Sequence, residues 1–460
     1  MLKLHPTAAS PWRGFGLIVQ NMILECCAMG VVAAVRPLKL LSLVFLLSGL
    51  SLAQSSPRVL ITKPVDESQL TVLKGNTHPL ARAEFDQGVA PMDLPMNRML
   101  LVLKRSDEQE SALRTLIDDQ QDKASPNYHK WLTPDEFGKQ FGPSDQDIQQ
   151  VTAWLQSHGF QIAQVSKGRT VIEFSGTAAQ VQEALHTSIH KYAVNGEQHW
   201  ANANDPQIPA ALTPVVAGVA SLSDFKPKAN VVKGPSGRWD PTLERFVPDL
   251  TGTISGQTYL FMGPGDAATI YHAPNSLNIR LASGQSTYDG TGVTIGIAGA
   301  TLLYHSGDES YRSFFGLAGN GATAVYDGSF SNFDINADET EANLDTEIAE
   351  GVAPGAKVVY YAAGDTLFQS GLILAIYRAI DDNQVDILSV SYSACEAAMG
   401  AAGNLEILNA WEQAAAQGMT VTVSTDDSGS AGCDNPDTET AATQGLAVNG
   451  LASTPYNIAV

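Results

Sequence analysis

The second half of this chain alternates short apolar runs with helical patterns, and this alternation constrains the fold more than any other feature. Five runs have the composition of buried strands, namely Val293–Ala298, Ala356–Ala362, Val385–Ser391, Thr420–Ser424 and Leu446–Asn449. Helical periodicity covers three stretches between them, namely Glu341–Glu350, Gly371–Asp382 and Leu405–Gln417. Such alternation predicts a parallel sheet with helices on both faces, whose reactive groups gather at the carboxyl ends of the strands.

The first of these helical stretches places two carboxylates side by side. Glu341 and Asp345 are one turn apart and share a helical face, while Leu344, Ile348 and Val352 recur at helical spacing. Acidic residues also crowd the first turn of ordinary helices, because a helix N-terminus carries partial positive charge. Taken alone, the stretch is more often an ordinary helix start than a reactive site.

Two of the expected strands end in polar residues. Ser391-Tyr392-Ser393 closes one, and Ser424–Ser430 closes the next. The second segment holds Asp427 in a tight turn that Gly429 assists, and a turn-forming aspartate is the commoner explanation for such a residue. The carboxyl end of a parallel strand is nevertheless where reactive groups are exposed, so Asp427 is a candidate site residue.

The first half of the chain predicts a separate α+β module. Its expected strands are Arg98–Arg105, Phe160–Val165, Thr170–Ser175 and Ser188–Val194, and its expected helices are Asp107–Gln121, a helix capped by Ser144, and Ala178–Leu185. The following stretch, Lys226–Val247, is rich in Pro, Gly and basic residues, which predicts an exposed linker open to proteolysis. We therefore divide the chain into an N-terminal extension with signal peptide (1–53), a first module (57–225), a linker with the processing site (226–250) and a second module (251–460).

Length and charge restrict the class of protein. With 460 residues, the chain is long enough for two or three domains of about 150 residues each. Its 27 Lys and Arg against 48 Asp and Glu give a net charge of −21, which argues against nucleic acid or an anionic membrane as a partner. Charged residues make up only 16% of the chain, which is typical of an acidic globular protein rather than a disordered tail.

The N-terminal region has the pattern of a secretory signal. Basic residues in Arg36–Lys39 precede the apolar run Leu40–Leu52 and the small residue Ala53, after which we expect cleavage. The run is short for a membrane span, and Met29 is an alternative start of translation. We therefore expect a secreted protein, extracellular or periplasmic, with no membrane association after cleavage.

Cysteine usage agrees with export. Cleavage after Ala53 removes Cys26 and Cys27 and leaves only Cys395 and Cys433. Two cysteines in an exported protein indicate one disulfide, which we predict joins this pair.

Motifs in both modules together resemble one family. In the second module they are Tyr259-Leu260, Pro264, Asp266, Thr269-Ile270-Tyr271, Glu341–Asp345, Ala353–Ala356 and Asp427–Ser430. In the first module they are Trp131–Pro134, Phe141–Ser144, Trp154-Leu155, Phe174–Thr177, Ile208-Pro209 and Val216–Val219. These motifs resemble the sedolisins, which are serine-carboxyl peptidases of the kumamolisin type. The resemblance implies a ferredoxin-like α+β activation prodomain followed by an incomplete α/β subtilisin-like catalytic domain.

The resemblance also implies roles for three carboxyl groups. Glu341 would be the general base, Asp345 the group that orients it, and Asp427 the carboxyl that stabilises the oxyanion. A carboxyl group normally loses its proton near pH 4, so a glutamate base can act in acid where imidazole stays protonated. A protonated aspartic acid can donate a hydrogen bond to a developing oxyanion. We interpret His272 and His305, the only histidines of the second module, as structural or surface residues.

The chain departs from the family pattern at several positions. The family's nucleophile is a serine in a Gly-Thr-Ser motif downstream of the Asp427 turn, and the 460 residues contain no such motif; Ser453 lacks the preceding Gly-Thr. The family's calcium site belongs to the same downstream portion, so we expect no metal ligand or other cofactor within these residues. Ser393 and Asp426 stand where relatives usually have glycine, and their side chains could crowd the cleft.

The leading hypothesis is therefore the zymogen of a secreted endopeptidase that acts on proteins or peptides at acidic pH. Its own prodomain would inhibit it, and the 460-residue form would be inactive for want of a nucleophile. An alternative is a non-catalytic inhibitor or binding protein for an intact relative. A dinucleotide-binding domain is disfavoured, because Gly290 and Gly292 precede a strand and Gly296 lies inside it, whereas the nucleotide fingerprint follows a strand.

Overall fold

The fold is taken from a computed structural model. It describes residues 57–229, 237–240, 245–248, 253–254, 257–258, 263–278, 281–317, 321–328, 338–434 and 441–460. The expected signal peptide, the Tyr259-Leu260 motif and most of the expected linker lie outside these residues. The chain divides into two compact units, Met1–Ser55 and Ser56–Val460, and everything below concerns the second.

The first module is built on a four-stranded antiparallel sheet. Its strands, in spatial order, are β4 (Gln161–Val165), β5 (Val171–Thr177), β3 (Pro95–Leu103) and β9 (Val216–Val219). Along the chain, helices separate β3 from β4 and β5 from β9, which gives the order β-α-β-β-α-β. Smaller sheets accompany it, formed by β2 (Asp86–Val89), β6 (Ile189–Val194) and β7 (Glu197–Asn202), and by β1 (Leu70–Val72) with β8 (Gln207–Pro209).

Side-chain caps fix where the helices of this module begin. Ser106 and Thr177 form capping boxes at α3 (Asp107–Gln121) and α6 (Ala178–Leu185), and Ser144 caps α5 (Asp145–Ser157). These three predicted helices are confirmed. A further helix, α4 (Pro134–Phe141), and a short 3₁₀ turn, η1 (Ala210–Leu212), were not predicted.

The second module contains the expected parallel sheet. Its six strands, in spatial order, are β16 (Thr323–Asp327), β17 (Lys357–Ala363), β15 (Thr294–Gly299), β18 (Ile387–Val390), β20 (Thr420–Val423) and β21 (Ile458–Ala459). Every neighbouring pair is parallel. Four of the five predicted strands are confirmed. The fifth, Leu446–Asn449, is wrong: Leu446 is 91% and Val448 52% exposed, and the backbone there makes only isolated bridges.

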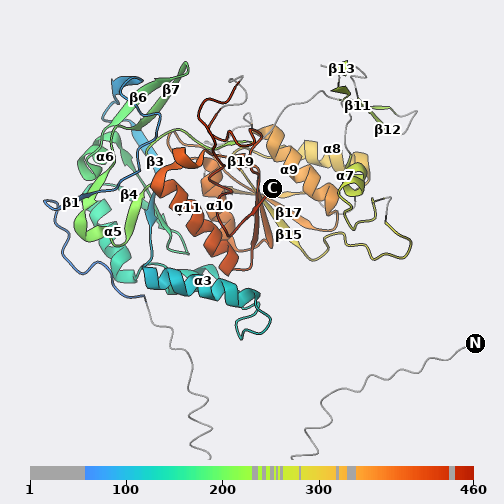
Figure 1. Cartoon of the computed structure of the whole chain (residues 1–460), viewed down its shortest axis with the longest axis horizontal. Helices are drawn as coiled ribbons and strands as arrows, with labels where there is room; N and C mark the ends of the chain where they lie inside the picture. Colours follow the sequence, from blue (N-terminus) through green and yellow to red (C-terminus); the bar gives the residue numbers. More distant parts are fainter. Residues whose placement is uncertain are drawn as a thin grey trace, which may run out of the picture. The chain divides into compact units, whose positions relative to one another are not determined.

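Helices cover both faces of this sheet (Figure 1). On one face, α10 (Gly371–Asp382) and α11 (Glu396–Ala416) pack against Val359 and Tyr361. On the other face, α9 (Glu339–Val352) packs against Val358 and Tyr360, and α8 (His305–Phe315) and α7 (Pro264–Ile270) contact α9.

The remaining strands are short: β10 (Lys228–Ala229), β11 (Gly237–Asp240), β12 (Arg245–Pro248), β13 (Thr253–Ile254), β14 (Gln257–Thr258) and β19 (Tyr392–Ser393). Within the described ranges, no helix combines the length and apolar character needed to cross a membrane.

Helix α9 turns carboxyl groups rather than large apolar side chains toward the interior. Glu341 is 3% exposed, whereas Leu344 is 44% and Ile348 37% exposed. Small residues permit this orientation, because a side chain at Gly351 would collide with Pro264 and the Tyr311 hydroxyl. The carboxylate-bearing face of α9 is therefore held inside the module.

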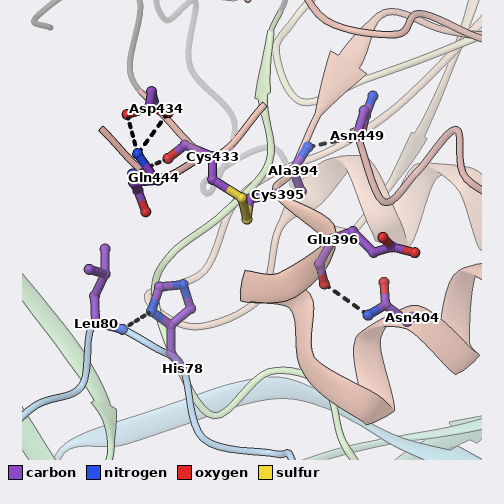
Figure 2. Close-up of a disulfide and its surroundings, with 10 residues drawn as sticks. All are labelled: His78, Leu80, Ala394, Cys395, Glu396, Asn404, Cys433, Asp434, Gln444 and Asn449. Atoms are coloured by element: carbon purple, nitrogen blue, oxygen red, sulfur yellow. Dashed lines mark hydrogen bonds between the residues drawn. A yellow bond between two sulfur atoms is a disulfide. The ribbon is translucent and has the colours of Figure 1, made fainter. Parts of the chain in front are cut away.

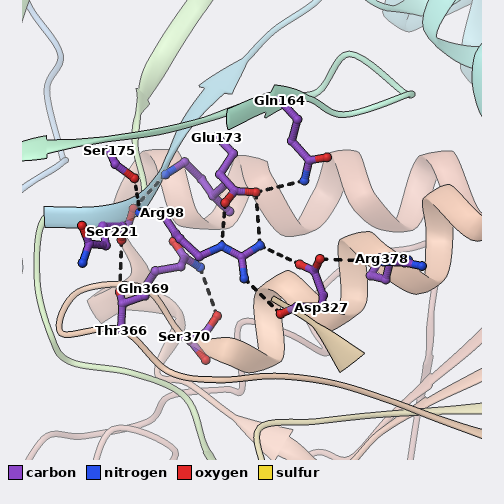
Figure 3. Close-up of polar contacts among 12 residues, drawn as sticks. Arg98, Gln164, Glu173, Ser175, Ser221, Asp327, Thr366, Gln369, Ser370 and Arg378 are labelled. Carbon is purple, nitrogen blue, oxygen red and sulfur yellow. Dashed lines mark hydrogen bonds and ion pairs between the residues drawn. The ribbon is translucent and has the colours of Figure 1, made fainter. Parts of the chain in front are cut away.

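Two arginines of the first module link it to the second. Arg98 Nε lies 2.6 Å from Glu173 Oε1 and its Nη2 lies 2.6 Å from Asp327 Oδ2 (Figure 3). Arg105 Nη1 likewise lies 2.9 Å from Glu110 Oε2 and 2.5 Å from Glu412 Oε2. Each guanidinium thus bridges one carboxylate of its own module and one of the other.

Replacing Arg105 should destabilise the chain strongly. Glu412 is fully buried, and among the described residues Arg105 is its cationic partner, so the substitution leaves this carboxyl buried without a cation. We expect Arg105→Ala to lower the free energy of unfolding by about 3–5 kcal/mol, measured by urea denaturation followed by circular dichroism. Arg82→Ala, which removes an exposed ion pair with Glu84, should change it by no more than about 1 kcal/mol. Equal effects of the two substitutions would contradict the bridging role.

Candidate active site

The carboxyl ends of β18 and β20 and the first turns of α9 form the candidate site. Glu341 and Asp345 lie one turn apart on α9, as predicted. Among the described residues, Glu341 Oε2 is buried without a hydrogen-bond partner. This oxygen is an acceptor that the surrounding chain leaves open.

Ser391 brings the strand end into contact with this pair. Its Oγ donates a hydrogen bond to Asp345 Oδ1 at 2.8 Å, from the residue that directly follows β18. The next residue, Tyr392, donates from its hydroxyl to Asp338 Oδ2 at 3.3 Å and accepts from the Ala300 N–H. The start of α9 is thereby fixed to the ends of two strands.

Burial makes both carboxyl groups of the pair weak acids. Desolvation is the largest cause, and it raises the pKa of Glu341 to about 8 and that of Asp345 to about 6. Repulsion from Asp345 adds to the rise at Glu341, while the Ser391 hydroxyl opposes it at both groups. The contact between the two carboxyls raises the pKa of Glu341 and lowers that of Asp345. The ordinary pKa near 4 assumed from the sequence does not hold in this setting.

Asp427 approaches the pair from the turn after β20. It is exposed, and its negative charge contributes to the raised pKa of Glu341. The turn itself is unusual, because Asp426 has a φ of 92°, a left-handed conformation that favours glycine. The Asp426 carboxylate accepts a hydrogen bond from the Ser428 N–H at 3.0 Å, which stabilises this conformation. The structure thus brings the three predicted carboxyls Glu341, Asp345 and Asp427 into one neighbourhood.

A disulfide and a buried amide hold the turn against the neighbouring strand (Figure 2). The predicted bond between Cys395 and Cys433 is present, and it links the start of α11 to the segment after Asp427. Asn449 Nδ2 donates to the carbonyls of Tyr392 and Ser424, at 2.9 and 2.7 Å. These links tie the ends of β18 and β20 together.

A short strand from the linker lies along the same edge. Lys228 and Ala229, which form β10, pair antiparallel with Ser393 and Tyr392 of β19. The neighbouring Lys226 Nζ lies 2.9 Å from Asp365 Oδ2 and donates to the Thr366 carbonyl. The chain that leaves the first module therefore pairs with the segment that directly follows Ser391, next to the carboxyl pair.

The contacts of Ser391 and Asn449 were not predicted from the sequence. The contact of Ser391 with Asp345 spans two elements, and the only signal in the sequence was its position at a strand end. Asn449 fell inside a wrongly predicted strand, although the dipeptide Asn449-Gly450 is a turn signal. Ser453 lies elsewhere, since its Oγ donates to Glu396 Oε1 at 3.1 Å near the start of α11.

The described residues do not fit a metal centre. Among them, no three His, Cys, Asp or Glu side chains are grouped so as to hold an ion. We therefore assign no calcium ligand and derive no step through a metal.

Comparisons with known proteins identify relatives of both modules. Residues 85–225 match the family model described as the pro-kumamolisin activation domain. The chain is 29% identical to sedolisin of Pseudomonas sp. (strain 101) over 364 residues, covering 76% of this chain and 57% of the relative. It is 28% identical to xanthomonalisin of Xanthomonas sp. (strain T-22), covering 69% and 38%, and 26% identical to kumamolisin of Bacillus sp. (strain MN-32), covering 79% and 63%.

A solved structure is also similar. It is a Pseudomonas sedolisin, a serine-carboxyl proteinase in complex with two molecules of pseudo-iodotyrostatin. It has 26% sequence identity and a TM-score of 0.36, covering 44% of this chain and 54% of that one. The present chain thus spans between 38% and 63% of the length of the curated relatives it matches.

Removing the Ser391 hydroxyl should weaken Asp345 as an acid. A hydrogen bond to a charged group is worth about 1.5–3 kcal/mol, so Ser391→Ala should raise the pKa of Asp345 until it is about tenfold weaker or more. The measurement is a ¹³C NMR titration of the side-chain carboxyls. Ser389→Ala, two residues earlier on the same strand face, is the control. An unchanged titration in Ser391→Ala would show that this contact does not set the charge of Asp345.

The raised pKa of Glu341 also predicts how stability varies with pH. A carboxyl whose pKa is higher in the folded chain contributes stability below its unfolded pKa, near 4.5, and loses it as pH rises toward about 8. The chain should therefore melt at a lower temperature at pH 8 than at pH 5. Glu341→Gln, which mimics the protonated group, should reduce that difference by several degrees in calorimetry. Glu339→Gln on the same first turn should leave it unchanged, and an undiminished difference in Glu341→Gln would refute the assignment.

Proposed function

We propose that this chain belongs to the zymogen of a secreted serine-type endopeptidase acting at acidic pH. The proposal rests on its homology to sedolisin, xanthomonalisin and kumamolisin and on its match to the pro-kumamolisin activation domain. Its substrates are proteins or peptides. The second module is a subtilisin-like catalytic domain, a proposal that its parallel sheet with helices on both faces supports. The first module is a ferredoxin-like activation domain, which its β-α-β-β-α-β order supports.

The observation that carries the proposal is the open acceptor on Glu341. Its buried Oε2 has no partner in the described part of the chain, and Asp345 and Asp427 lie near the same carboxyl. In the proposed enzyme, a serine hydroxyl donates to this oxygen. That hydrogen bond stabilises the carboxylate and lowers the pKa of Glu341, which allows the group to act as a general base in acid. Without such a donor, the pair retains its proton.

The other groups then have separate tasks. Asp345, held by Ser391, orients Glu341. Asp427, as a carboxylic acid, donates a hydrogen bond to the oxyanion of the tetrahedral intermediate. The proton that Glu341 takes from the serine is returned to the leaving amine, as in acyl transfer with other general bases.

The nucleophile is not among the 460 residues in this proposal. They contain no Gly-Thr-Ser motif, and Ser453 is bonded to Glu396 rather than directed at the carboxyl pair. The proposal therefore predicts that the 460-residue form is inactive.

The activation domain acts as an intramolecular inhibitor. The linker strand Lys228–Ala229 adds to β19 as an extended peptide would, and main-chain pairing of this kind is a general way of binding peptides. A substrate that uses the same edge must first displace this strand.

A second candidate function is a non-catalytic inhibitor or binding protein for an intact relative. The observation that favours it is that the 460 residues contain no Gly-Thr-Ser motif. Reading the coding DNA beyond codon 460 separates the two: an in-frame Gly-Thr-Ser favours the enzyme, and a stop codon favours the inhibitor.

The enzymatic proposal predicts which forms are active. A chain extended through the missing serine should hydrolyse casein at acidic pH, and Glu341→Ala should reduce that activity by roughly a hundredfold or more. The 460-residue form should show no hydrolysis under the same conditions. Hydrolysis by that form would refute our placement of the nucleophile, and full activity of the Glu341→Ala variant would refute the assigned base.

A further inference from the structure

Two histidines enclose the last aromatic side chain of the first module. The His78 ring is stacked on Phe225 with centroids 3.8 Å apart and planes 2° apart. The His199 ring stacks on Phe225 as well, at 4.0 Å and 16°. Phe225 is followed directly by Lys226 and Pro227 and then by the linker strand Lys228–Ala229. This stack therefore holds the point where the chain leaves the first module.

His78 is held as a neutral ring. Its Nδ1 accepts a hydrogen bond from the Leu80 N–H at 3.2 Å, which requires that this nitrogen carry no proton (Figure 2). Burial is the main cause that lowers the pKa of His78, to about 4, and the charge of His199 lowers it further. A proton on Nδ1 would remove the hydrogen bond and set an N–H group against the Leu80 N–H.

The charged groups on the surrounding elements are already engaged. His199 is paired through its ring nitrogens with Asp224, at 3.0 Å, and Glu197, at 3.6 Å. Asp205 accepts hydrogen bonds from the N–H groups of Gly75 and Asn76 and from the Thr77 hydroxyl. Lys226 pairs with Asp365 of the second module. Of these groups, His199 is the one that acts on the charge of His78, and it repels a proton there.

We propose that the His78–Phe225–His199 stack is a latch that opens in acid and thereby frees the linker strand from β19. At neutral pH the stacked, neutral His78 keeps Phe225 fixed, and Lys228–Ala229 stays paired with Tyr392 and Ser393. In acid, His78 takes up a proton, loses its bond to Leu80 and moves away from Phe225. The further step, in which this opening permits removal of the activation domain, rests on the proposed function. The opening of the latch in acid does not depend on that function.

The difference in the pKa of His78 between the closed and open states determines how opening depends on pH. A histidine whose pKa is lower in the closed state stabilises that state above about pH 6.5, and this stabilisation is lost as pH falls toward 4. The equilibrium constant for opening should therefore grow by up to about tenfold for each pH unit across this interval, and by roughly 300-fold in total.

Hydrogen exchange of the linker tests the latch without any peptidase activity. In the full 460-residue chain, peptides covering residues 222–229 should lose protection between pH 6.5 and 4, after correction for the intrinsic pH dependence of exchange. His78→Gln, which cannot take up a proton, should keep them protected across this range or show no change of protection with pH. His190→Gln is the matched control, because it removes another histidine of the same module, one that pairs with Asp86. It should behave as the unmodified chain does.

Loss of protection with the same pH midpoint in His78→Gln and in the unmodified chain would overturn the proposal. A second measurement guards against a variant that fails to fold, namely imidazole NMR titration of His78 in the unmodified chain. His78 should titrate well below 6.5, together with the resonances of Phe225, and titration at the ordinary value with Phe225 unmoved would equally refute the latch. Failure of the proposed peptidase would appear instead as an extended chain that hydrolyses nothing while the latch still opens.

Discussion

Desolvation of carboxyl groups governs the second half of this molecule. Burial raises the pKa of Glu341 and Glu350 on α9 and of Glu406 and Glu412 on α11, in each case as the largest cause. A buried carboxyl is tolerated if it keeps a proton or gains a cation. The chain uses both solutions: Arg312 lies 2.9 Å from Glu350, whereas burial is the only cause acting on Glu406. Such an interior is most stable while these carboxyls keep their protons.

The same principle explains why the two modules fit together. Arg98 and Arg105 each stand between carboxylates of both modules, so neither module alone satisfies its own charges at this contact. A cavity of about 220 Å³ remains beside the Arg98 bridge, lined by residues of both modules such as Glu173 and Arg378. The linker strand adds main-chain pairing with β19 to this connection. The contact between the modules thus combines directional ion pairs with a strand that is held by backbone hydrogen bonds. These backbone bonds depend little on which side chains the strand carries.

How much the sequence could predict depends on the range of the interactions involved. Helices such as α3 and α6 were predicted with correct bounds, because Ser106 and Thr177 cap them locally. The shared face of Glu341 and Asp345 likewise follows from helical geometry alone. The segment ending at Asn449 was misjudged as a strand, because its side chain bonds to Tyr392 and Ser424, which are distant in sequence. The roles of the carboxyls came from the family resemblance.

The charge state of the site could not be read from the sequence. The pKa of Glu341 depends on burial by elements that only the fold brings together, and on Asp427 in the turn after β20. The contact between Ser391 and Asp345 is tertiary for the same reason. Strand β16 was missed because its residues are only partly buried at the edge of the sheet, so they lack a continuous apolar run.

The disulfide has a mechanical consequence. Cys395 and Cys433 are 38 residues apart and enclose α11 and β20 in a covalent ring. If the chain is pulled by its ends, the segment inside this ring cannot extend. At about 3.4 Å per residue, roughly 130 Å of contour length is therefore not released while the disulfide is intact. Reduction would release that length in a single force-extension step. The segment bearing Asp427 therefore stays covalently tied to the start of α11 even in a chain that has been stretched open elsewhere.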